Sequence, residues 1–273
     1  MIFFITFLLL AAEPSLQAIV EPAGGSVGFA AVAVHSGRSL GLHQDQAFPM
    51  QSVFKLPIAI EVLRQVDKGN IDLDHEVLLG KDDAREGATT IVVPSRTTVR
   101  KLLEAMVENS DNIACDRLLA LVGGPRAVDA RMRHLGIEGI TIRFSEREMT
   151  AGKGDNTATP AAMVALLIKL ARHRLGLSPT SAKHIEDLLC QVVTGAKRIK
   201  GALPPGTPVA HKTGTSRTQD GKTAATNDVG LISLPNGNRI AIAVFLHDSP
   251  ADERLQEETI AKLARAAYDY FQR

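Results

Sequence analysis

The chain has 273 residues, of which 31 are Lys or Arg and 30 are Asp or Glu, so its formal net charge is +1. This near balance argues against a nucleic-acid-binding protein, which usually carries an excess or a stripe of basic residues. The hydrophobic share of 45% and the charged share of 22% are typical of a globular protein rather than a disordered or fibrous one. At about 150 residues per domain, the length predicts two domains or lobes.

The first twelve residues are an apolar run that ends in Ala11 and Ala12. The run is too short to span a bilayer, which needs about 20 residues, but it fits the apolar part of a secretory signal with small residues at the cleavage site. No Lys or Arg precedes it, and a buried N-terminal strand or helix is the alternative. We expect residues 1–12 to be a signal segment, the protein to be periplasmic or secreted, and no stable membrane span.

The part that follows predicts a short helix at Ser15–Val20, a strand of apolar and β-branched residues at Val27–His35, and a helix at Ser52–Lys68. The middle of the chain is helical in pattern, with Gly and Pro residues at the expected ends. The helices predicted there are Thr98–Val107, Asn112–Val122, Pro125–Leu135, Pro160–Arg174 and Pro179–Val193.

The last part of the chain changes to strands, predicted at Val209–Lys212, Asp228–Leu234 and Arg239–His247, before a closing helix at Asp252–Phe271. Pro235–Asn238 contains an Asn-Gly pair, which favours a tight hairpin between the last two strands. The sequence therefore predicts an α+β fold, in which one antiparallel sheet is built from both chain ends and flanked by helices.

The same pattern predicts two lobes. Residues 13–46 and 195–273 would form the α/β lobe that contains the sheet. Residues 47–194 would form an all-helical lobe inserted between them.

The two cysteines, Cys115 and Cys190, make neither a disulfide framework nor a Cys-x-x-Cys metal pair. Each lies inside an amphipathic helical pattern, so we expect buried thiols, although the sequence leaves their pairing open. The eight His residues have no His-x-His or His-Glu-x-x-His spacing, and a zinc hydrolase is not expected.

A first reactive pattern is Ser52-Val53-Phe54-Lys55 at the start of a predicted helix. Residues three apart lie on one helical face, which brings the Ser52 hydroxyl and the Lys55 ammonium together. The free N–H groups of a helix N-terminus can stabilise negative charge on a reacting carbonyl. A serine is a weak nucleophile without an adjacent base, and a desolvated lysine is one candidate for that base. The pattern alone is common by chance.

A second pattern, Ser110-Asp111-Asn112, falls in the break between two predicted helices. A loop held by helices can present a hydroxyl and an amide to a ligand, although the same residues are also good helix N-caps.

A third pattern, Lys212-Thr213-Gly214-Thr215, ends a predicted strand. A cation and a hydroxyl followed by Gly suit the anchoring of an anionic substrate, and an ordinary turn is the alternative. All three patterns occur in this order by chance in fewer than about one such chain in a thousand.

Together the three patterns resemble the active-site elements of penicillin-recognising serine enzymes. The segment Glu146–Thr150 resembles the carboxylate-bearing Ω-loop of class A β-lactamases, and the resemblance covers essentially all of the chain after the leader. His211–Ser216 and Gly221–Asp228 are most similar to the second subclass, which includes extended-spectrum cephalosporinases. Where the family more often has Asn at the fifth Ω-loop position, this chain has Thr150.

The resemblance implies a catalytic role for four residues. Ser52 would attack the β-lactam carbonyl and form an acyl-enzyme, with the backbone N–H groups of Ser52 and Thr215 as the oxyanion hole. Lys55, or Glu146 acting through a water, would remove the hydroxyl proton. Ser110, next to Lys212, would relay a proton to the leaving nitrogen. Glu146 would then activate the water that cleaves the ester.

The resemblance also implies substrate-binding residues. Asn112 would bind the side-chain amide of the substrate, and Thr213, Thr215 and Arg198 would hold its carboxylate, although the Arg198 region also fits a solvated charged face. Thr150 would take the place of the Asn that helps to hold the hydrolytic water.

A β-lactam is therefore the expected small-molecule partner, with no cofactor, no metal and no nucleic acid, and a monomer is expected because the family's members are typically monomers. Two alternatives remain for the activity. A penicillin-binding D,D-peptidase or a β-lactam sensor would be acylated without turning over. The Glu146 carboxylate argues against the peptidase, and the lack of a membrane-spanning segment in the sequence argues against the sensor.

Overall fold

The computed structural model describes residues 15–273, so the expected signal segment lies outside the described residues. The helices are α1 Leu16–Val20, α2 Lys55–Asp67, α3 Val99–Glu108, α4 Asn112–Leu121, α5 Pro125–His134, α6 Glu146–Thr150, α7 Pro160–Ala171, α8 Pro179–Cys190 and α9 Glu253–Gln272. The strands are β1 Ser26–Ala33, β2 Ser39–Leu42, β3 Phe48–Pro49, β4 Glu76–Leu79, β5 Ser95–Thr98, β6 Ile140–Thr141, β7 Thr157–Ala158, β8 Val209–Thr215, β9 Thr218–Gln219, β10 Lys222–Thr223, β11 Thr226–Ser233 and β12 Arg239–His247.

A five-stranded antiparallel sheet with the order β2-β1-β12-β11-β8 joins the two ends of the chain. Strand β1 pairs with β12 so that Ala30 lies opposite Ala243. The Asn-Gly pair turns the chain between β11 and β12, where Gly237 has a φ of 80°. The predicted α+β class and the sheet from both chain ends are confirmed, and β2 is a strand that the sequence analysis did not predict.

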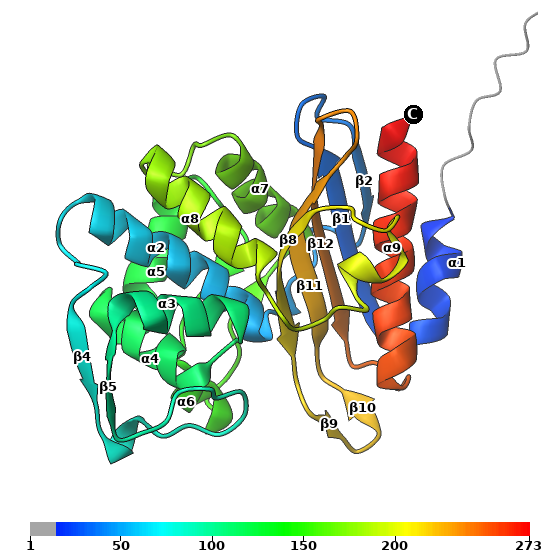
Figure 1. Ribbon diagram of the computed structural model, residues 1–273. Helices are drawn as coiled ribbons and strands as arrows, with labels where there is room; N and C mark the ends of the chain where they lie inside the picture. The colour runs from blue at the N-terminus through cyan, green and yellow to red at the C-terminus, as the bar shows by residue number, and fades with distance from the viewer. Residues whose placement is uncertain (1–14) are drawn as a thin grey trace, which may run out of the picture.

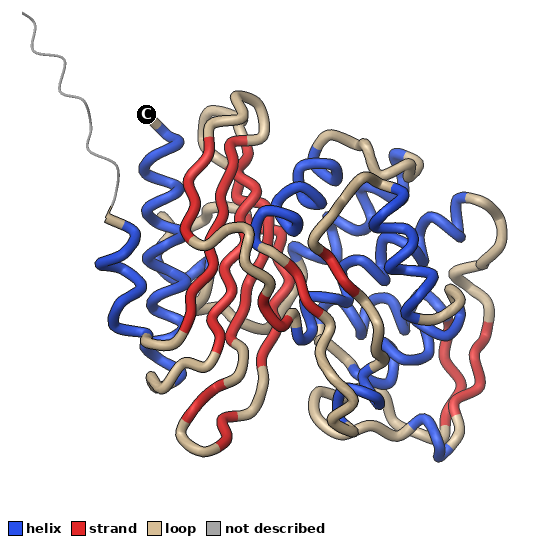
Figure 2. The backbone as a smooth tube through the Cα atoms, turned by 180° about the vertical axis from the view of Figure 1, so that it is seen from behind, coloured by secondary structure: helices blue, strands red, loops and turns tan. Residues whose placement is uncertain are grey.

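The sheet lies between α1 and α9 on one side and the helices of the middle of the chain on the other (Figures 1 and 2). A hydrophobic core lies on each side of it. Because successive side chains of a strand point to opposite faces, β12 contributes to both cores. Ile242 and Val244 pack in the core beneath α1 and α9, whereas Ala243 and Phe245 belong to the core shared with the helices of the middle of the chain. The division into lobes at residues 47 and 194 stays a prediction.

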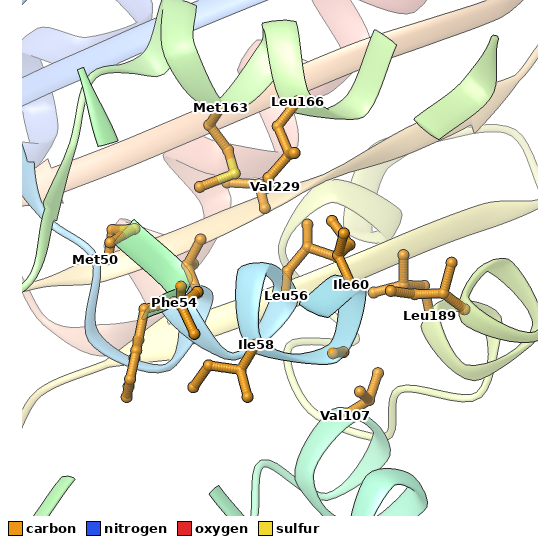
Figure 3. Packing of buried hydrophobic residues seen from close by; sticks show 14 of the residues in the cluster. Met50, Phe54, Leu56, Ile58, Ile60, Val107, Met163, Leu166, Leu189 and Val229 are labelled. Carbon is orange, nitrogen blue, oxygen red and sulfur yellow. The ribbon is translucent and has the colours of Figure 1, made fainter. Parts of the chain in front are cut away.

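Helix α2 is the centre of the larger core (Figure 3). Every residue from Lys55 to Leu63 is buried, which is typical of a helix enclosed on all sides. The predicted helix at Ser52–Lys68 begins as a 3-10 turn, Gln51–Phe54, and becomes α-helical at Lys55. Pro57 is therefore the third α-helical residue, where its missing N–H has no partner to lose.

The two cysteines are free thiols, but only one is buried. Cys115 lies within α4, and burial raises the pKa of its thiol well above the usual value. Cys190 is exposed at the end of α8, so the expectation of two buried thiols is wrong for this residue. Its place in the last turn takes it beyond the apolar face that the rest of the helix buries.

No helix between residues 15 and 273 combines the length and apolar character needed to cross a membrane.

Leu63 tests the packing of α2 because it is fully buried, with a relative exposure of 0%. We expect Leu63→Ala to lower the free energy of unfolding by about 2–5 kcal/mol, since truncation leaves a cavity in the core. Leu78→Ala is the control, because Leu78 is 66% exposed and its truncation should change stability by less than about 0.5 kcal/mol. Urea unfolding measures both, and equal effects would contradict this description of the core.

Candidate active site

Ser52 lies in the 3-10 turn that leads into α2, half-buried and directly before the enclosed part of the helix. The residue before it, Gln51, has a φ of 45°, in the left-handed region that non-glycine residues rarely adopt. The Lys55 ammonium donates to Ser52 Oγ at 3.0 Å, as the three-residue spacing predicts. The local fold therefore presents one hydroxyl beside one buried amine.

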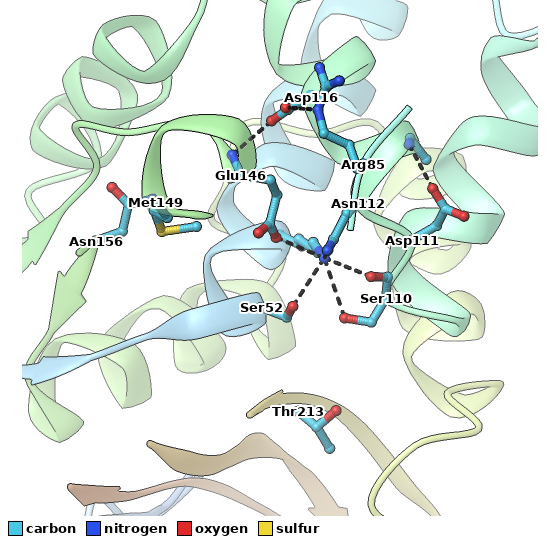
Figure 4. Close-up of polar contacts among 12 residues, drawn as sticks. Ser52, Arg85, Ser110, Asp111, Asn112, Asp116, Glu146, Met149, Asn156 and Thr213 are labelled. Atoms are coloured by element: carbon cyan, nitrogen blue, oxygen red, sulfur yellow. Dashed lines mark hydrogen bonds and ion pairs between the residues drawn. The ribbon is translucent and has the colours of Figure 1, made fainter. Parts of the chain in front are cut away.

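The Lys55 ammonium is fully buried and contacts oxygen atoms from the turn at Ser52, the Ser110–Asn112 segment and α6. Figure 4 shows Ser52, Ser110 and Glu146 gathered at this place. Besides Ser52 Oγ, it contacts Ser110 O at 2.7 Å, Asn112 Oδ1 at 2.7 Å and Glu146 Oε1 at 2.9 Å. A buried cation is tolerated only when it is paired and hydrogen-bonded, and these contacts meet that condition. Lys55 thus brings together the first two sequence patterns and the Ω-loop carboxylate.

The Ser110–Asn112 segment has two functions in the fold. Asp111 caps α4 by accepting from Ala114 N at 2.8 Å, and its other oxygen accepts from Ile91 N at 2.9 Å. Ser110, with a φ of 62°, and Asn112 are left to face Lys55. The two interpretations of this pattern, helix cap and site, are therefore both supported, by different residues of the tripeptide.

Glu146 is the first residue of α6, a five-residue helix that the sequence analysis did not predict. Its backbone N–H donates to Asp116 Oδ1 at 2.8 Å, and Arg147 N donates to Asp116 Oδ2 at 3.2 Å. Arg85 donates to Asp116 Oδ2 at 2.5 Å, which balances the charge of this buried carboxylate. Asp116 therefore fixes the start of α6, and with it the direction from which Glu146 approaches Lys55.

Strand β8 brings the third pattern to the same place. Lys212 is fully buried, and its ammonium donates to Ser110 Oγ at 3.0 Å. Gly214 allows the close approach, because a Cβ at this position would lie 2.4 Å from Met50 O and 3.2 Å from Ser52 N. All three patterns and Glu146 thus form one site.

The pKa of Lys212 is lowered to about 7, mainly by burial and then by the nearby Lys55 cation. The carboxylates of Asp228 and Glu146 oppose this shift. Lys212 therefore exchanges its proton near neutral pH. Its ammonium form is present below about pH 7 and is lost as the pH rises through that value.

The remaining predicted residues surround this centre in different ways. Thr213 is buried, and its Oγ1 lies 2.6 Å from Thr194 Oγ1. The Arg198 guanidinium donates to Gly214 O and to Asn227 O at 3.3 and 3.0 Å. Arg198 is thus buried against β8 and β11, rather than on a solvated face.

Thr215 and Thr150 are the two exposed members of the predicted site. Thr215 ends β8, one residue beyond Gly214, and Thr150 ends α6. Their roles stay predictions.

The comparisons with known proteins agree with this arrangement. The profile of the β-lactamase enzyme family matches residues 11–271. The extended-spectrum β-lactamase PER-1 of Pseudomonas aeruginosa is 36% identical, over 99% of this chain and 92% of the relative. The chain belongs to the class A β-lactamase family.

Solved structures of the family have the same fold as this β-lactamase. The TLA-3 extended-spectrum β-lactamase matches with a TM-score of 0.91 and 34% identity, over 96% of this chain and 98% of that one. A class A β-lactamase from Bacteroides cellulosilyticus matches with a TM-score of 0.87 and 28% identity, over 94% and 95% of the two chains.

Two supporting residues were missed in the sequence analysis. Asp116 has a weak sequence signal, since it is the acidic residue of α4 and, with Arg117, interrupts its apolar residues. Asn156 holds the loop before α6 by accepting from Arg143 N and Phe144 N through its side-chain oxygen. Nothing in its local sequence distinguishes Asn156 from an ordinary loop residue.

The low pKa of Lys212 predicts an alkaline limb in the activity of this β-lactamase. If the Lys212 cation attracts the anionic substrate, kcat/KM should fall as the pH rises above about 7, because the cation is then lost. Lys212→Arg should retain the positive charge, since Arg stays protonated throughout. The fall of kcat/KM should then begin at a pH at least about one unit higher than in the parent. Initial rates between pH 5.5 and 9.5 measure this, and identical limbs in the two proteins would contradict it.

Proposed function

We propose that this β-lactamase hydrolyses penicillins and cephalosporins through an acyl-enzyme on Ser52. The observation that carries the proposal is the contact of one buried ammonium, that of Lys55, with both Ser52 Oγ at 3.0 Å and Glu146 Oε1 at 2.9 Å. A serine needs a neighbouring base, and the ester it forms needs an activated water. This contact places groups suited to both steps around one hydroxyl.

In the acylation step, Ser52 Oγ attacks the carbonyl carbon of the β-lactam. Its proton goes to Lys55 after Lys55 has passed its own proton to Glu146, 2.9 Å away, or it goes to Glu146 through a water. The negative charge that develops on the carbonyl oxygen is stabilised by the N–H groups of Ser52 and Thr215. The lactam C–N bond then breaks, and Ser110 passes a proton to the nitrogen. Ser110 suits this relay because its hydroxyl accepts from Lys212 at 3.0 Å and lies 3.5 Å from Lys55 Nζ.

In the deacylation step, Glu146 removes a proton from a water that attacks the ester carbonyl. The C–O bond to Ser52 breaks, and Ser52 Oγ takes a proton from Lys55, which regains one from Glu146 as the product leaves. The Asp116 contacts at the start of α6 support this role, because they hold the Glu146 backbone in place.

Substrate binding uses the rest of the site. Thr213, Thr215 and Lys212 suit a carboxylate. Arg198 supports this part of the site by donating to carbonyl groups of β8 and β11. Asn112 suits the side-chain amide of the substrate. PER-1 is named as an extended-spectrum β-lactamase. Extended-spectrum cephalosporins are therefore candidate substrates for this protein.

Glu146→Gln tests the proposal against a protein that is only acylated. The parent should convert many equivalents of a chromogenic cephalosporin, whereas the variant should show one stoichiometric burst and then turn over about 10²- to 10⁴-fold more slowly. Glu148→Gln is the matched control, since Glu148 lies on the same helix and faces Ser145 and Lys153.

A parent that stops after one burst would contradict hydrolysis and favour a penicillin-binding peptidase or a sensor. A variant that deacylates at the parental rate would contradict the role of Glu146.

We also propose that the protein is exported as a monomer, with the apolar run at residues 1–12 as its signal segment. The mature protein isolated from the periplasm should then begin shortly after Ala12 when its intact mass is measured. A periplasmic protein that still begins at Met1 would contradict this, and elution as a dimer in size-exclusion chromatography would contradict the monomer.

A further inference from the structure

Asn227 joins the strand β11 to the segment that carries the nucleophile. Its side chain has a relative exposure of 0%. The side-chain nitrogen donates to Pro49 O at 2.8 Å and to Met50 O at 3.1 Å. In the pairing of β11 with β8, Asn227 lies directly opposite Gly214.

The two carbonyl groups that Asn227 holds belong to the residues just before the strained turn. Gln51 adopts a φ of 45°, and such a conformation persists only when the surrounding structure determines it. On the other side of this segment, Met50 N donates to Asn156 O at 2.8 Å. Asn227 therefore provides part of the polar contacts that fix the backbone entering Ser52.

The Met50 carbonyl also lies against β8. A Cβ on Gly214 would approach Met50 O to 2.4 Å, so the carbonyl occupies the space next to that glycine. Holding Met50 O therefore fixes the separation between the backbone at Ser52 and the backbone at Thr215, the residue after Gly214. Arg198 supports the same unit by donating to Asn227 O at 3.0 Å.

The side-chain oxygen of Asn227 indicates that this residue acts through its N–H donors. Within residues 15–273, Asn227 Oδ1 is buried and has no hydrogen-bond partner. An unsatisfied buried oxygen is unfavourable, and an apolar side chain at this position would avoid it.

We propose that Asn227 is a positioning residue for the oxyanion hole. By holding Met50 O against β8, it sets the distance between the N–H groups of Ser52 and Thr215. It acts through the backbone and touches no substrate. This inference rests on the proposed function, because it requires acylation of Ser52.

The experiment measures acylation in the Glu146→Gln background, where the acyl-enzyme accumulates. Stopped-flow mixing with a chromogenic cephalosporin gives the acylation rate constant, normalised to the sites that the burst titrates. Asn227→Ala should lower this constant about 10- to 100-fold, since small displacements of catalytic groups have effects of this size. The concentration of half-saturation should change by less than about threefold, because the loss is in the transition state. The acylation rate constant of Asn227→Ser, which keeps one donor, should lie between those of the parent and of Asn227→Ala.

Gln256→Ala is the matched control. Gln256 is 1% exposed and donates to Thr223 Oγ1 at 3.0 Å and to Ala251 O at 2.7 Å, so its loss should also lower the melting temperature. It contacts Thr226, next to Asn227, but holds the chain away from Ser52. Its acylation rate constant per titrated site should stay within about threefold of the parent.

Two results would overturn the inference. One is an acylation rate constant per titrated site in Asn227→Ala that equals the parental value; if the alanine variant does not fold, Asn227→Ser is used instead. The other is an equal loss of this rate constant in Gln256→Ala. Either result would show that Asn227 serves stability alone. If no acyl-enzyme forms in protein that retains Asn227, the proposed function is overturned, and this inference with it.

Discussion

The fully buried ammonium of Lys55 is the constraint on which the site depends. An unpaired charge in a protein interior costs several kcal/mol, and the chain meets this cost with oxygen atoms from the turn at Ser52, the break at Ser110–Asn112 and the start of α6. These segments are distant in sequence and meet at one atom. The groups that we propose to be catalytic are therefore held together by the same interaction that allows the helix carrying Lys55 to be buried.

This convergence has a conformational cost that the surrounding residues offset. Gln51 and Ser110 both have left-handed backbone conformations, each unfavourable by about 1–3 kcal/mol. Asp111 stabilises the second of these segments by capping α4 and by accepting from the loop at Ile91. Asp116 acts in the same way on α6. The carboxylates that hold backbone N–H groups thus contribute to the geometry of the site together with the side chains that contact Lys55.

The sequence predicts the long elements of this fold well, because helices such as α9 and strands such as β12 have a strong apolar period. It does not predict the two-residue strands β3, β6 and β7, which pair only because the tertiary fold brings them together. In the site, spacing alone indicates the contact of Ser52 with Lys55. The contacts of Asp116 and Asn227 with distant backbone groups have no such local pattern, and the exposure of Cys190 depends on where α8 ends.

The position of the covalent bond in the acyl-enzyme tests the role of Ser52 most directly. Glu146→Gln protein would be mixed with a penicillin, digested and mapped by tandem mass spectrometry. We expect a single adduct on the hydroxyl of Ser52, and none when Ser52→Ala is added. An adduct on any other residue, or an unmodified Ser52 in protein that still consumes substrate, would contradict it.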